Sequence, residues 1–286
     1  LLAGKSAVNY SCYFGATNNN YPQFAQLDKH RVCGIKLFMG SSTGNMLVDR
    51  MEVLRKVFAN AGMLIATHCE EQAIISATTV AFKENTDKYK KAYGDDVPLT
   101  LHPVIRSEEA CYRSSELAVQ LAREANARLH IMHISTAREL DLFSDAPLIT
   151  KRITAEACVS HLLFTEDDYQ TLGARIKCNP AIKTAEDRKA LQEAVNSGLI
   201  DAIATDHAPH LLSEKEGGAL KAMSGMPMIQ FSLASMLELV DKGIFSIEKI
   251  VEKMSHAPAQ MYEINNRGFI HKGYQADLVL VRPNSK

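Results

Sequence analysis

Short apolar runs alternate with segments that carry apolar residues at helical spacing, and this alternation most limits the folds open to the chain. Each run has the length and composition of a buried strand, and the segments between the runs are long enough for helices. Strands that alternate with helices in this way are typical of parallel βα units. The sequence therefore predicts an α/β protein with about six parallel strands, over residues 8–14, 33–38, 63–67, 129–133, 153–157 and 202–204.

The predicted helices have recognisable ends. Ser107 opens a helix of about twenty residues. Thr184-x-x-Asp187 is a capping box, and the helix behind it ends at Gly198. Thr136-x-x-Glu139 is a second capping box. Further helices are predicted over residues 47–61, 71–82, 228–240 and 246–254, whereas residues 98–103 are predicted to form a loop.

Polar side chains stand at the carboxyl ends of the predicted strands. They are Lys36, His68, His133, His161 and Asp206. An open doubly wound sheet and a (β/α)₈ barrel both fit the strand pattern, but in a barrel every strand ends at the one face where a site is assembled. The sequence also has no Gly-x-Gly-x-x-Gly phosphate loop of the kind that nucleotide-binding sheets use. These two observations favour the barrel.

The segment from Ile200 to His210 shows why such side chains need partners. Its short apolar strand ends in Asp206, and Pro209 prevents the strand from continuing. A buried carboxylate without a partner costs several kcal/mol, so it is protonated, paired with a cation or bound to a metal. A loop or helix-capping carboxylate is the alternative for this motif taken alone.

Two histidines and one aspartate at strand ends, His68, His133 and Asp206, form a nitrogen and oxygen ligand set suited to Zn²⁺. Such a set leaves positions for water, which ionises near neutral pH and becomes a nucleophile. Either histidine alone would more often be a hydrogen-bonded structural residue. Lys36 differs, because an ammonium cannot ligate a cation; it either lies away from the metal or has lost its positive charge.

Composition narrows the possible partners. With 32 basic and 33 acidic residues the net charge is -1, which provides no electrostatic footprint for nucleic acid or an anionic membrane surface. No apolar run approaches the roughly 18 residues that span a bilayer, and no secretory leader opens the chain. The six cysteines are scattered singly, which argues against a disulfide framework or a zinc ribbon. We therefore expect a cytoplasmic protein whose partner is a small molecule.

Seven stretches, taken together, resemble the dihydroorotases of the amidohydrolase superfamily over nearly the whole chain. In order they are Gly34-Ile-Lys-Leu-Phe-Met-Gly-Ser-Ser-Thr-Gly44, Thr67-His-Cys-Glu70, His130-Ile-Met-His-Ile-Ser-Thr136, Glu156-Ala-Cys-Val-Ser-His161, Lys177-Cys-Asn-Pro180, Ala204-Thr-Asp-His-Ala-Pro-His210 and Ser224-Gly-Met-Pro227. The resemblance implies a (β/α)₈ TIM-type barrel of the amidohydrolase type. It also implies a zinc-dependent enzyme that interconverts N-carbamoyl-L-aspartate and L-dihydroorotate in pyrimidine biosynthesis.

The same resemblance implies roles for individual residues. Lys36 would be carboxylated by CO₂ and bridge two zinc ions, with His68 and His133 on the second metal and Asp206 on the first. Asp206 would also be the catalytic residue that moves the proton. The ring amide and carboxylate of the substrate would be held by the remaining matched residues, which are Asn179, His210 and the Ser224–Gly225 backbone, with His161 nearby.

Other functions stay open beside this one. Dihydropyrimidinases or hydantoinases, and allantoinases, share the strand that holds Lys36 and continues into Phe38. The segment Asp206-His-Ala-Pro-His210 together with Asn179 discriminates among them and favours a dihydroorotase. From another class, a catalytically inactive dihydroorotase-like scaffold could support a partner enzyme. Retention of the metal-ligating residue types argues against that scaffold.

The chain departs from the family pattern in one respect. The family's first barrel strand has a His-x-His metal motif and an arginine for the substrate carboxylate, and this chain contains neither. Its first predicted strand would correspond to the family's third. We therefore expect a barrel domain over 1–262 without its first two strands, the start of a small β-domain over 263–286, and no competent enzyme from this stretch alone. A homo-oligomer is also compatible with the sequence.

Overall fold

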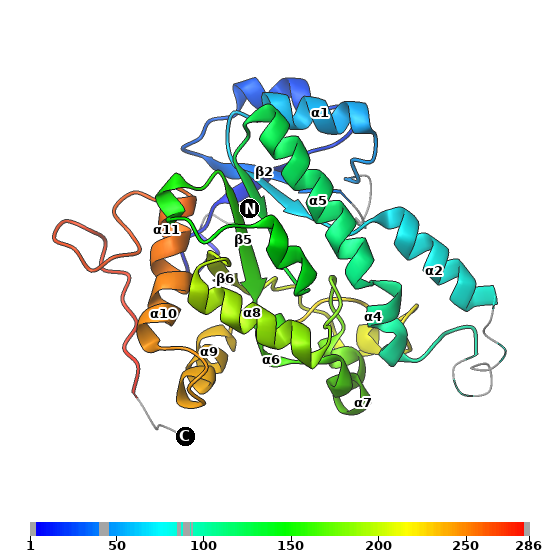
Figure 1. Cartoon of the computed structure of the whole chain (residues 1–286). Coiled ribbons are helices and arrows are strands. Elements are labelled where there is room, and N and C mark those ends of the chain that lie inside the picture. Colours follow the sequence, from blue (N-terminus) through cyan, green and yellow to red (C-terminus); the bar gives the residue numbers. More distant parts are fainter. Residues whose placement is uncertain (1–3, 40–45, 85–86, 88–91, 93, 283–286) are drawn as a thin grey trace.

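The computed structural model describes residues 4–39, 46–84, 87, 92 and 94–282. These residues contain a six-stranded sheet whose strands run parallel and lie side by side in chain order (Figure 1). The strands are β1 (Cys12–Gly15), β2 (Val32–Phe38), β3 (Ile65–His68), β4 (Leu129–Ile131), β5 (Ile153–Cys158) and β6 (Ala202–Ala204). The predicted α/β class and the succession of parallel βα units are confirmed.

Burial on both faces explains why these segments form strands. All four residues of β3 are buried, and so is every residue of β5 after Ile153. In β2 the side chains of Ile35 and Leu37 are fully buried as well. Strands that are covered on both faces are typical of parallel sheets with helices packed around them.

The register of the strands places their carboxyl ends at one edge of the sheet. Phe38 at the end of β2 pairs with His68 at the end of β3. Farther along the sheet, Cys158 at the end of β5 pairs with Ala204 at the end of β6. Side chains that follow the strands therefore meet at the same face of the molecule, as in a barrel enzyme.

The helices lie around the strands in Figure 1. They are α1 (Met51–Asn60), α2 (Gln72–Glu84), α4 (His102–Ile105), α5 (Glu108–Ala125), α6 (Val159–Leu163), α7 (Tyr169–Leu172), α8 (Ala185–Ser197), α9 (Ser232–Asp241), α10 (Ile247–Val251) and α11 (Ala257–Met261). The apolar side chains of these helices and of the strands form one large core. No helix among the described residues is long and apolar enough to cross a membrane.

Two of the predicted helix ends are confirmed in detail. The Ser107 hydroxyl accepts a hydrogen bond from the backbone of Ala110 at 3.3 Å and so caps α5. Thr184 and Asp187 form the predicted capping box of α8. That helix ends at Gly198, whose φ of 94° lies in the left-handed region that glycine adopts without strain.

Other local predictions are wrong. The Thr136 hydroxyl accepts from the backbone of Glu139 at 3.3 Å, as in a capping box, but a 3₁₀ turn at Arg138–Leu142 follows instead of an α-helix. The Glu139 carboxylate accepts from Ser115 of α5 at 2.6 Å in the core. The predicted loop over 98–103 is a 3₁₀ turn, Leu99–Leu101, that leads into α4. Pro103 lies in the first turn of that helix, where its missing N–H is tolerated.

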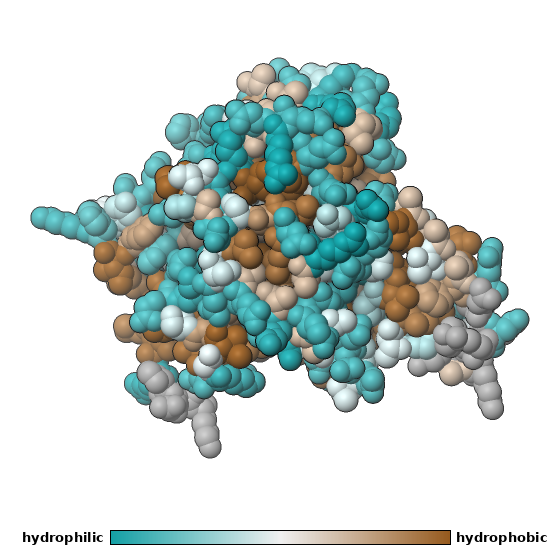
Figure 2. Space-filling model, viewed as in Figure 1, coloured by the Kyte–Doolittle hydropathy of each residue, from teal (hydrophilic) through white to brown (hydrophobic). Residues whose placement is uncertain are grey.

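The segment after α11 carries apolar side chains into solvent. Ile270 is 91% exposed and Leu280 is 99% exposed. Apolar side chains gather along the left of the molecule in Figure 2, where this segment and α10 lie in Figure 1. Residues 263–282 form turns and irregular backbone. The assignment of 263–286 to a small β-domain therefore stays a prediction.

A buried ion pair on the amino-terminal side of β5 and β6 gives a test of the fold. Lys151 Nζ lies 2.7 Å from Asp201 Oδ1, and both side chains are almost completely buried. Asp201→Ala leaves the ammonium without its partner, which destabilises a protein by about 3–5 kcal/mol. Chemical denaturation measures this loss.

Glu238→Ala is the matched control, since Glu238 pairs with Lys242 and both side chains are about 60% exposed. Breaking a surface pair changes stability by about 1 kcal/mol or less. Equal effects of Asp201→Ala and Glu238→Ala would contradict the importance of burial at Asp201.

Candidate active site

The predicted residues converge at the carboxyl edge of the sheet. His68 ends β3, and its Nδ1 lies 3.0 Å from Nε2 of His133, which follows β4. Lys36 lies on β2. Its Nζ is 2.7 Å from Met132 Sδ and 4.7 Å from the centre of the Phe38 ring. The two histidines and the lysine thus lie within one small region, as predicted.

Asp206 interacts electrostatically with Lys36 and His68. Burial lowers the pKa of Lys36, and the negative charges of Glu156 and Asp206 oppose that effect. The pKa of Asp206 is raised by desolvation of its carboxyl, which outweighs the opposing charges of His68 and Lys36. Burial thus favours the neutral amine of Lys36, and Asp206 has the raised pKa of a group suited to proton transfer.

Two of the site residues, His133 and Asp206, have a strained backbone conformation. His133 has a φ of 42° and Asp206 a φ of 43°, so both adopt the left-handed conformation directly after their strands. For a residue with a side chain this conformation costs on the order of 1–3 kcal/mol and persists where the surrounding structure enforces it. Such strain clusters at functional sites, which agrees with the roles predicted for these two residues.

His133 and His161 are neutral imidazoles. Burial lowers the pKa of His133 well below its ordinary value and the pKa of His161 to about 4. His161 Nε2 donates to the Pro180 carbonyl at 3.0 Å, so Nδ1 is the unprotonated ring nitrogen. Neither that atom nor His133 Nδ1 has a hydrogen-bond partner. The site therefore contains buried acceptors that are available to a ligand.

The histidine pair fits a metal ion. His68 Nδ1 and His133 Nε2 face each other at 3.0 Å, and two zinc-bound nitrogens in tetrahedral geometry lie roughly 3.3 Å apart. In the described part of the chain, no cluster of three or more His, Cys, Asp or Glu side chains is arranged to hold a metal. The metal-binding roles of His68, His133, Asp206 and a carboxylated Lys36 therefore stay predictions.

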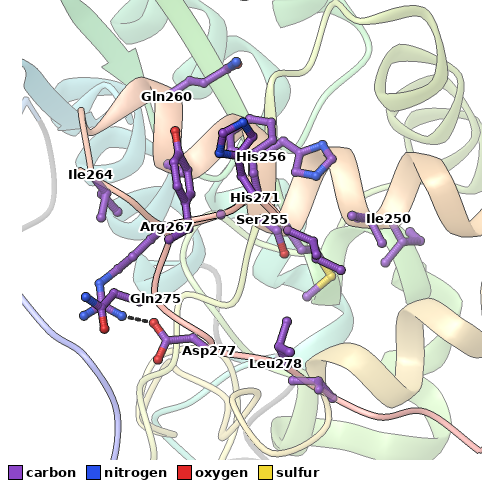
Figure 3. Close-up of a pocket in the computed structure, with 18 of the residues that line it drawn as sticks. Ile250, Ser255, His256, Gln260, Ile264, Arg267, His271, Gln275, Asp277 and Leu278 are labelled. Atoms are coloured by element: carbon purple, nitrogen blue, oxygen red, sulfur yellow. Dashed lines mark ion pairs between the residues drawn. The ribbon is translucent and has the colours of Figure 1, made fainter.

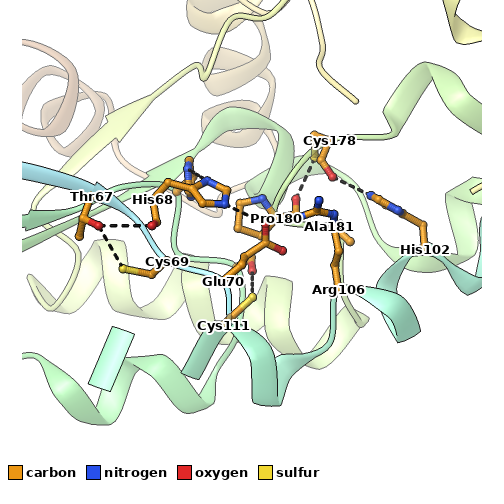
Figure 4. A network of polar contacts seen from close by, with 12 residues as sticks. Thr67, His68, Cys69, Glu70, His102, Arg106, Cys111, Cys178, Pro180 and Ala181 are labelled. Atoms are coloured by element: carbon orange, nitrogen blue, oxygen red, sulfur yellow. Dashed lines mark hydrogen bonds and ion pairs between the residues drawn. The ribbon is translucent and has the colours of Figure 1, made fainter. Parts of the chain in front are cut away.

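Glu70 and Arg106 orient His68. Glu70 is completely buried, and its Oε2 lies 2.9 Å from His68 Nε2 while it also pairs with Arg106 (Figure 4). Burial would raise the pKa of Glu70, but the charge of Arg106 and the contact with His68 lower it to about 2. An ionised carboxylate on Nε2 leaves Nδ1 of His68 facing His133, as metal-binding histidines require. Glu70 lies in the matched motif, but neither residue was predicted to act in the site.

The expected substrate-binding residues lie together on neighbouring loops. Gly225 N donates to the carbonyl of Lys177 at 2.8 Å, so the Ser224–Gly225 turn lies beside the segment that contains Asn179. His210 Nε2 donates to the Ser224 carbonyl at 3.1 Å. Asn179 Oδ1 is buried without a partner, which leaves it free to accept from a ligand.

Gly225 allows the close approach of these loops. It has a φ of 143°, and an added Cβ would lie 2.4 Å from the Ala208 carbonyl oxygen. Only glycine combines this conformation with this contact. The matched motif over 40–44, by contrast, lies outside the described residues.

A large cavity of about 1020 Å³ lies elsewhere, between α10, α11 and the segment that follows them (Figure 3). Its lining includes His256, Arg267 and His271 but none of the predicted site residues. The Phe269 ring stacks on His256 at a centroid distance of 4.3 Å. The chemistry described above is therefore separate from this cavity.

Comparison with known proteins places the chain in a family. A model of the amidohydrolase family matches residues 40–286, and the chain belongs to that family. An allantoinase from Solibacter usitatus is 32% identical over 98% of this chain and 61% of the relative. A dihydroorotase from Halobacterium salinarum is 29% identical over 99% of this chain and 63% of the relative. The chain thus spans a little over three fifths of these relatives.

Solved structures agree with the predicted architecture. The L-hydantoinase (dihydropyrimidinase) from Arthrobacter aurescens superposes with a TM-score of 0.85 at 26% identity, covering 94% of this chain and 60% of that one. A dihydropyrimidinase from Brevibacillus agri superposes with a TM-score of 0.81 at 23% identity, over 96% of this chain and 60% of that one. The TIM-type barrel of the amidohydrolase type and the resemblance to the cyclic amidohydrolase group are confirmed.

His102 gives a pH test of how the site loops are held. It is buried on α4, and its Nε2 donates to the carbonyl of Cys178, next to Asn179, at 2.8 Å. Burial, with the nearby charge of Lys177, lowers the pKa of His102 from 6.5 to about 3. As pH falls below 6.5 the unfolded chain binds a proton there that the folded chain does not. The protein should therefore lose up to about 1.4 kcal/mol per pH unit from this residue.

His102→Gln keeps a donor to Cys178 but has no titrating group. Urea unfolding between pH 7.5 and 4.5 should show a stability difference between the variant and the wild type that shifts in favour of the variant as pH falls. Parallel losses of stability in the two proteins would contradict a neutral His102 in the folded state.

Proposed function

We propose that this protein is a zinc-dependent dihydroorotase that interconverts N-carbamoyl-L-aspartate and L-dihydroorotate in pyrimidine biosynthesis. The proposal rests on the cluster in which the segment ending in His210, the Ser224–Gly225 turn and Asn179 lie against one another. Of these, Asn179 and the segment that ends in His210 are the motifs that we expect to distinguish dihydroorotases from the other cyclic amidohydrolases. The unpartnered Oδ1 of Asn179 in this cluster supports a role in holding the ring.

The charge of the neighbouring residues supports an anionic substrate. Lys177 is buried next to Asn179, and burial with the charges of Arg106 and Lys215 lowers its pKa to about 8. Lys177 is therefore still mostly protonated at pH 7. Dihydroorotate carries a carboxylate, whereas dihydrouracil, hydantoin and allantoin are neutral rings. A positive potential from these cations favours the carboxylate-bearing ring.

The proposed mechanism assigns a task to each residue of the site. His68 and His133 would hold a divalent metal, which would supply Lewis-acid chemistry and lower the pKa of a water. Asp206 accepts the proton of the attacking water and delivers it to the leaving ring nitrogen. In the biosynthetic direction the same carboxylate takes the proton from the nitrogen as the ring closes.

The substrate contacts follow from the groups that lack partners. Asn179 Oδ1 and His161 Nδ1 are buried acceptors, so they suit the ring N–H groups. His210 and Ser224 line the carboxylate side of the ring in this proposal. Gly225 N already donates to Lys177, so we assign Gly225 the task of allowing the loops to approach.

We also propose two zinc ions per subunit in the complete enzyme, and Lys36, once carboxylated by CO₂, would be among the residues that hold them. The lowered pKa of Lys36 supports it, because only the neutral amine reacts with CO₂. We further propose a cytoplasmic enzyme that acts on small molecules and assembles with copies of itself. The small β-domain that would begin at residue 263 is part of the same proposal.

A hydantoinase or allantoinase is the second candidate. The allantoinase that is 32% identical and the hydantoinase structure with a TM-score of 0.85 favour it. An inactive scaffold is a weaker alternative, because a scaffold has no need of strained His133 and Asp206 or of unpartnered acceptors.

A substrate panel tests the choice between these enzymes. We expect the native protein to hydrolyse dihydroorotate with a kcat/KM on the order of 10³-fold or more above that for dihydrouracil, hydantoin or allantoin. A site that is built to pair a polar group of its substrate rejects analogues without that group by several orders of magnitude. Initial rates on the four rings, followed spectroscopically, measure the ratio. A higher kcat/KM for allantoin or hydantoin would favour the second candidate.

Asp206→Asn tests the proton transfer. The amide cannot accept a proton, so ring closure from N-carbamoyl-L-aspartate should slow by about 100-fold or more. Circular dichroism and zinc analysis should show an intact fold with at least one metal bound. Asp167→Asn, at a residue outside the site, serves as the control and should keep full activity. Ring closure by Asp206→Asn at near the wild-type rate would remove Asp206 from the mechanism.

A further inference from the structure

Lys215 makes an unusual set of contacts for a loop lysine. It lies at the end of the 3₁₀ turn Leu212–Lys215 and is half-buried. Its ammonium donates to three backbone carbonyls, those of Lys177 at 3.0 Å, Met223 at 2.8 Å and Gly225 at 2.7 Å. An ammonium has three N–H donors, so every donor of Lys215 is used on the backbone.

These carbonyls belong to the two segments that we assign to the substrate. The Lys177 carbonyl precedes Asn179, and the Met223 and Gly225 carbonyls flank Ser224. The Lys177 ammonium in turn donates to the carbonyl of Ala222. The side chains of Lys177 and Lys215 therefore both link the segment of Asn179 to the segment that contains Ser224.

The same 3₁₀ turn also reaches His210. Glu214 Oε2 lies 3.5 Å from His210 Nδ1 and accepts from the backbone of Leu211 at 2.8 Å. Adjacent residues of one turn thus contact the His210 segment, the Ser224–Gly225 turn and the segment of Asn179. None of these contacts involves the metal-binding histidines.

Asp96 anchors the loop that follows Lys215. Its carboxylate accepts from the backbone N–H groups of Gly218 at 2.7 Å and Leu220 at 2.9 Å. Asp96 is itself almost fully buried. An added Cβ at Gly218 would lie 2.0 Å from the Val97 carbonyl oxygen, so the loop also packs closely against this part of the chain. Asp96 therefore holds the loop at Gly218 and Leu220. Lys215 lies in the sequence between these residues and His210.

We propose that Lys215 is a positioning residue for substrate binding, which fixes the spacing between Asn179 and the Ser224–Gly225 turn through its three hydrogen bonds to the backbone. This role rests on the proposed function, in which these groups hold the ring. Hydrogen bonds from a charged donor are stronger than those between neutral groups. Three of them, on two segments, fix the distance between the segment of Asn179 and the Ser224–Gly225 turn. The role concerns binding rather than chemistry, because Lys215 contacts neither Asp206 nor the histidine pair in any described contact.

Lys215→Met in the native protein tests this proposal, because methionine has a similar length and no donor. We expect KM to rise by about tenfold or more, since three carbonyls lose a charged donor. We expect kcat to stay within about threefold of wild type, because the groups that carry the reaction are unchanged. Zinc content should match that of the wild type.

Lys221→Met is the matched control. Lys221 lies on the same loop, but its side chain is 54% exposed and pairs only with Asp95 among the contacts described for it. Its KM, kcat and zinc content should all equal those of the wild type. The assay uses whichever of dihydroorotate, allantoin, hydantoin and dihydrouracil the wild type hydrolyses fastest. A preference for a ring other than dihydroorotate would overturn the proposed function, while the effect on KM would still test Lys215.

An unchanged KM in Lys215→Met would overturn the proposal. So would parallel losses of kcat, zinc and thermal stability, because these indicate a general structural role. If Lys215→Met is insoluble, Lys215→Arg decides the question. Its planar guanidinium keeps the charge but cannot direct three donors as an ammonium does. A raised KM with retained kcat in Lys215→Arg supports the positioning role, and a wild-type KM overturns it.

Discussion

Desolvation at the carboxyl edge of the sheet is the constraint on which the site depends. Strands β3, β4 and β5 are almost completely buried, so the polar side chains at their ends lose water and each must find a partner or change its protonation state. Burial keeps His133 and His161 neutral, favours the neutral amine of Lys36 and raises the pKa of Asp206. The same loss of water therefore leaves two neutral imidazoles, a lysine with a lowered pKa and an aspartate with a raised pKa at one edge of the sheet.

Two buried glutamates show how a neighbouring charge decides the protonation state of an acid in this region. Glu70 is completely buried, and it remains a carboxylate because Arg106 pairs with it. Glu139, also buried, has only hydroxyl and backbone donors close to it as hydrogen-bond partners, and burial raises its pKa. The comparison shows why Glu70, rather than another buried acid, is suited to accept from His68.

The sequence predicts the parts of this structure that depend on local patterns. The strands, the Ser107 cap, the Thr184–Asp187 capping box and the residues at the strand ends follow from periodicity and turn chemistry. The failures have distant causes. Thr136 and Glu139 have the spacing of a capping box, but Ser115 of α5 binds the Glu139 carboxylate.

The sequence also did not predict contacts in and near the site between residues that lie far apart in the chain. Arg106 meets Glu70 from 36 residues away, and Gly218 meets Asp96 from 122 residues away. Neither pair has a spacing that a local pattern could reveal. The seven matched motifs located Glu70 and Lys177, yet they said nothing about which groups these side chains bind.

The residues that we propose for the chemistry and those that we propose for substrate binding are held in different ways. His68, His133 and Asp206 stand on or directly after strands, where the register of the parallel sheet sets their positions. Asn179, His210 and Ser224 stand on loops, whose spacing depends on side chains that bind backbone groups. Changes in the loops can therefore alter the ring that is bound without moving the groups that react. This arrangement accounts for relatives named dihydroorotase, allantoinase and hydantoinase at similar identity to one chain, because barrel enzymes share the strand ends and differ in the loops that bind the substrate.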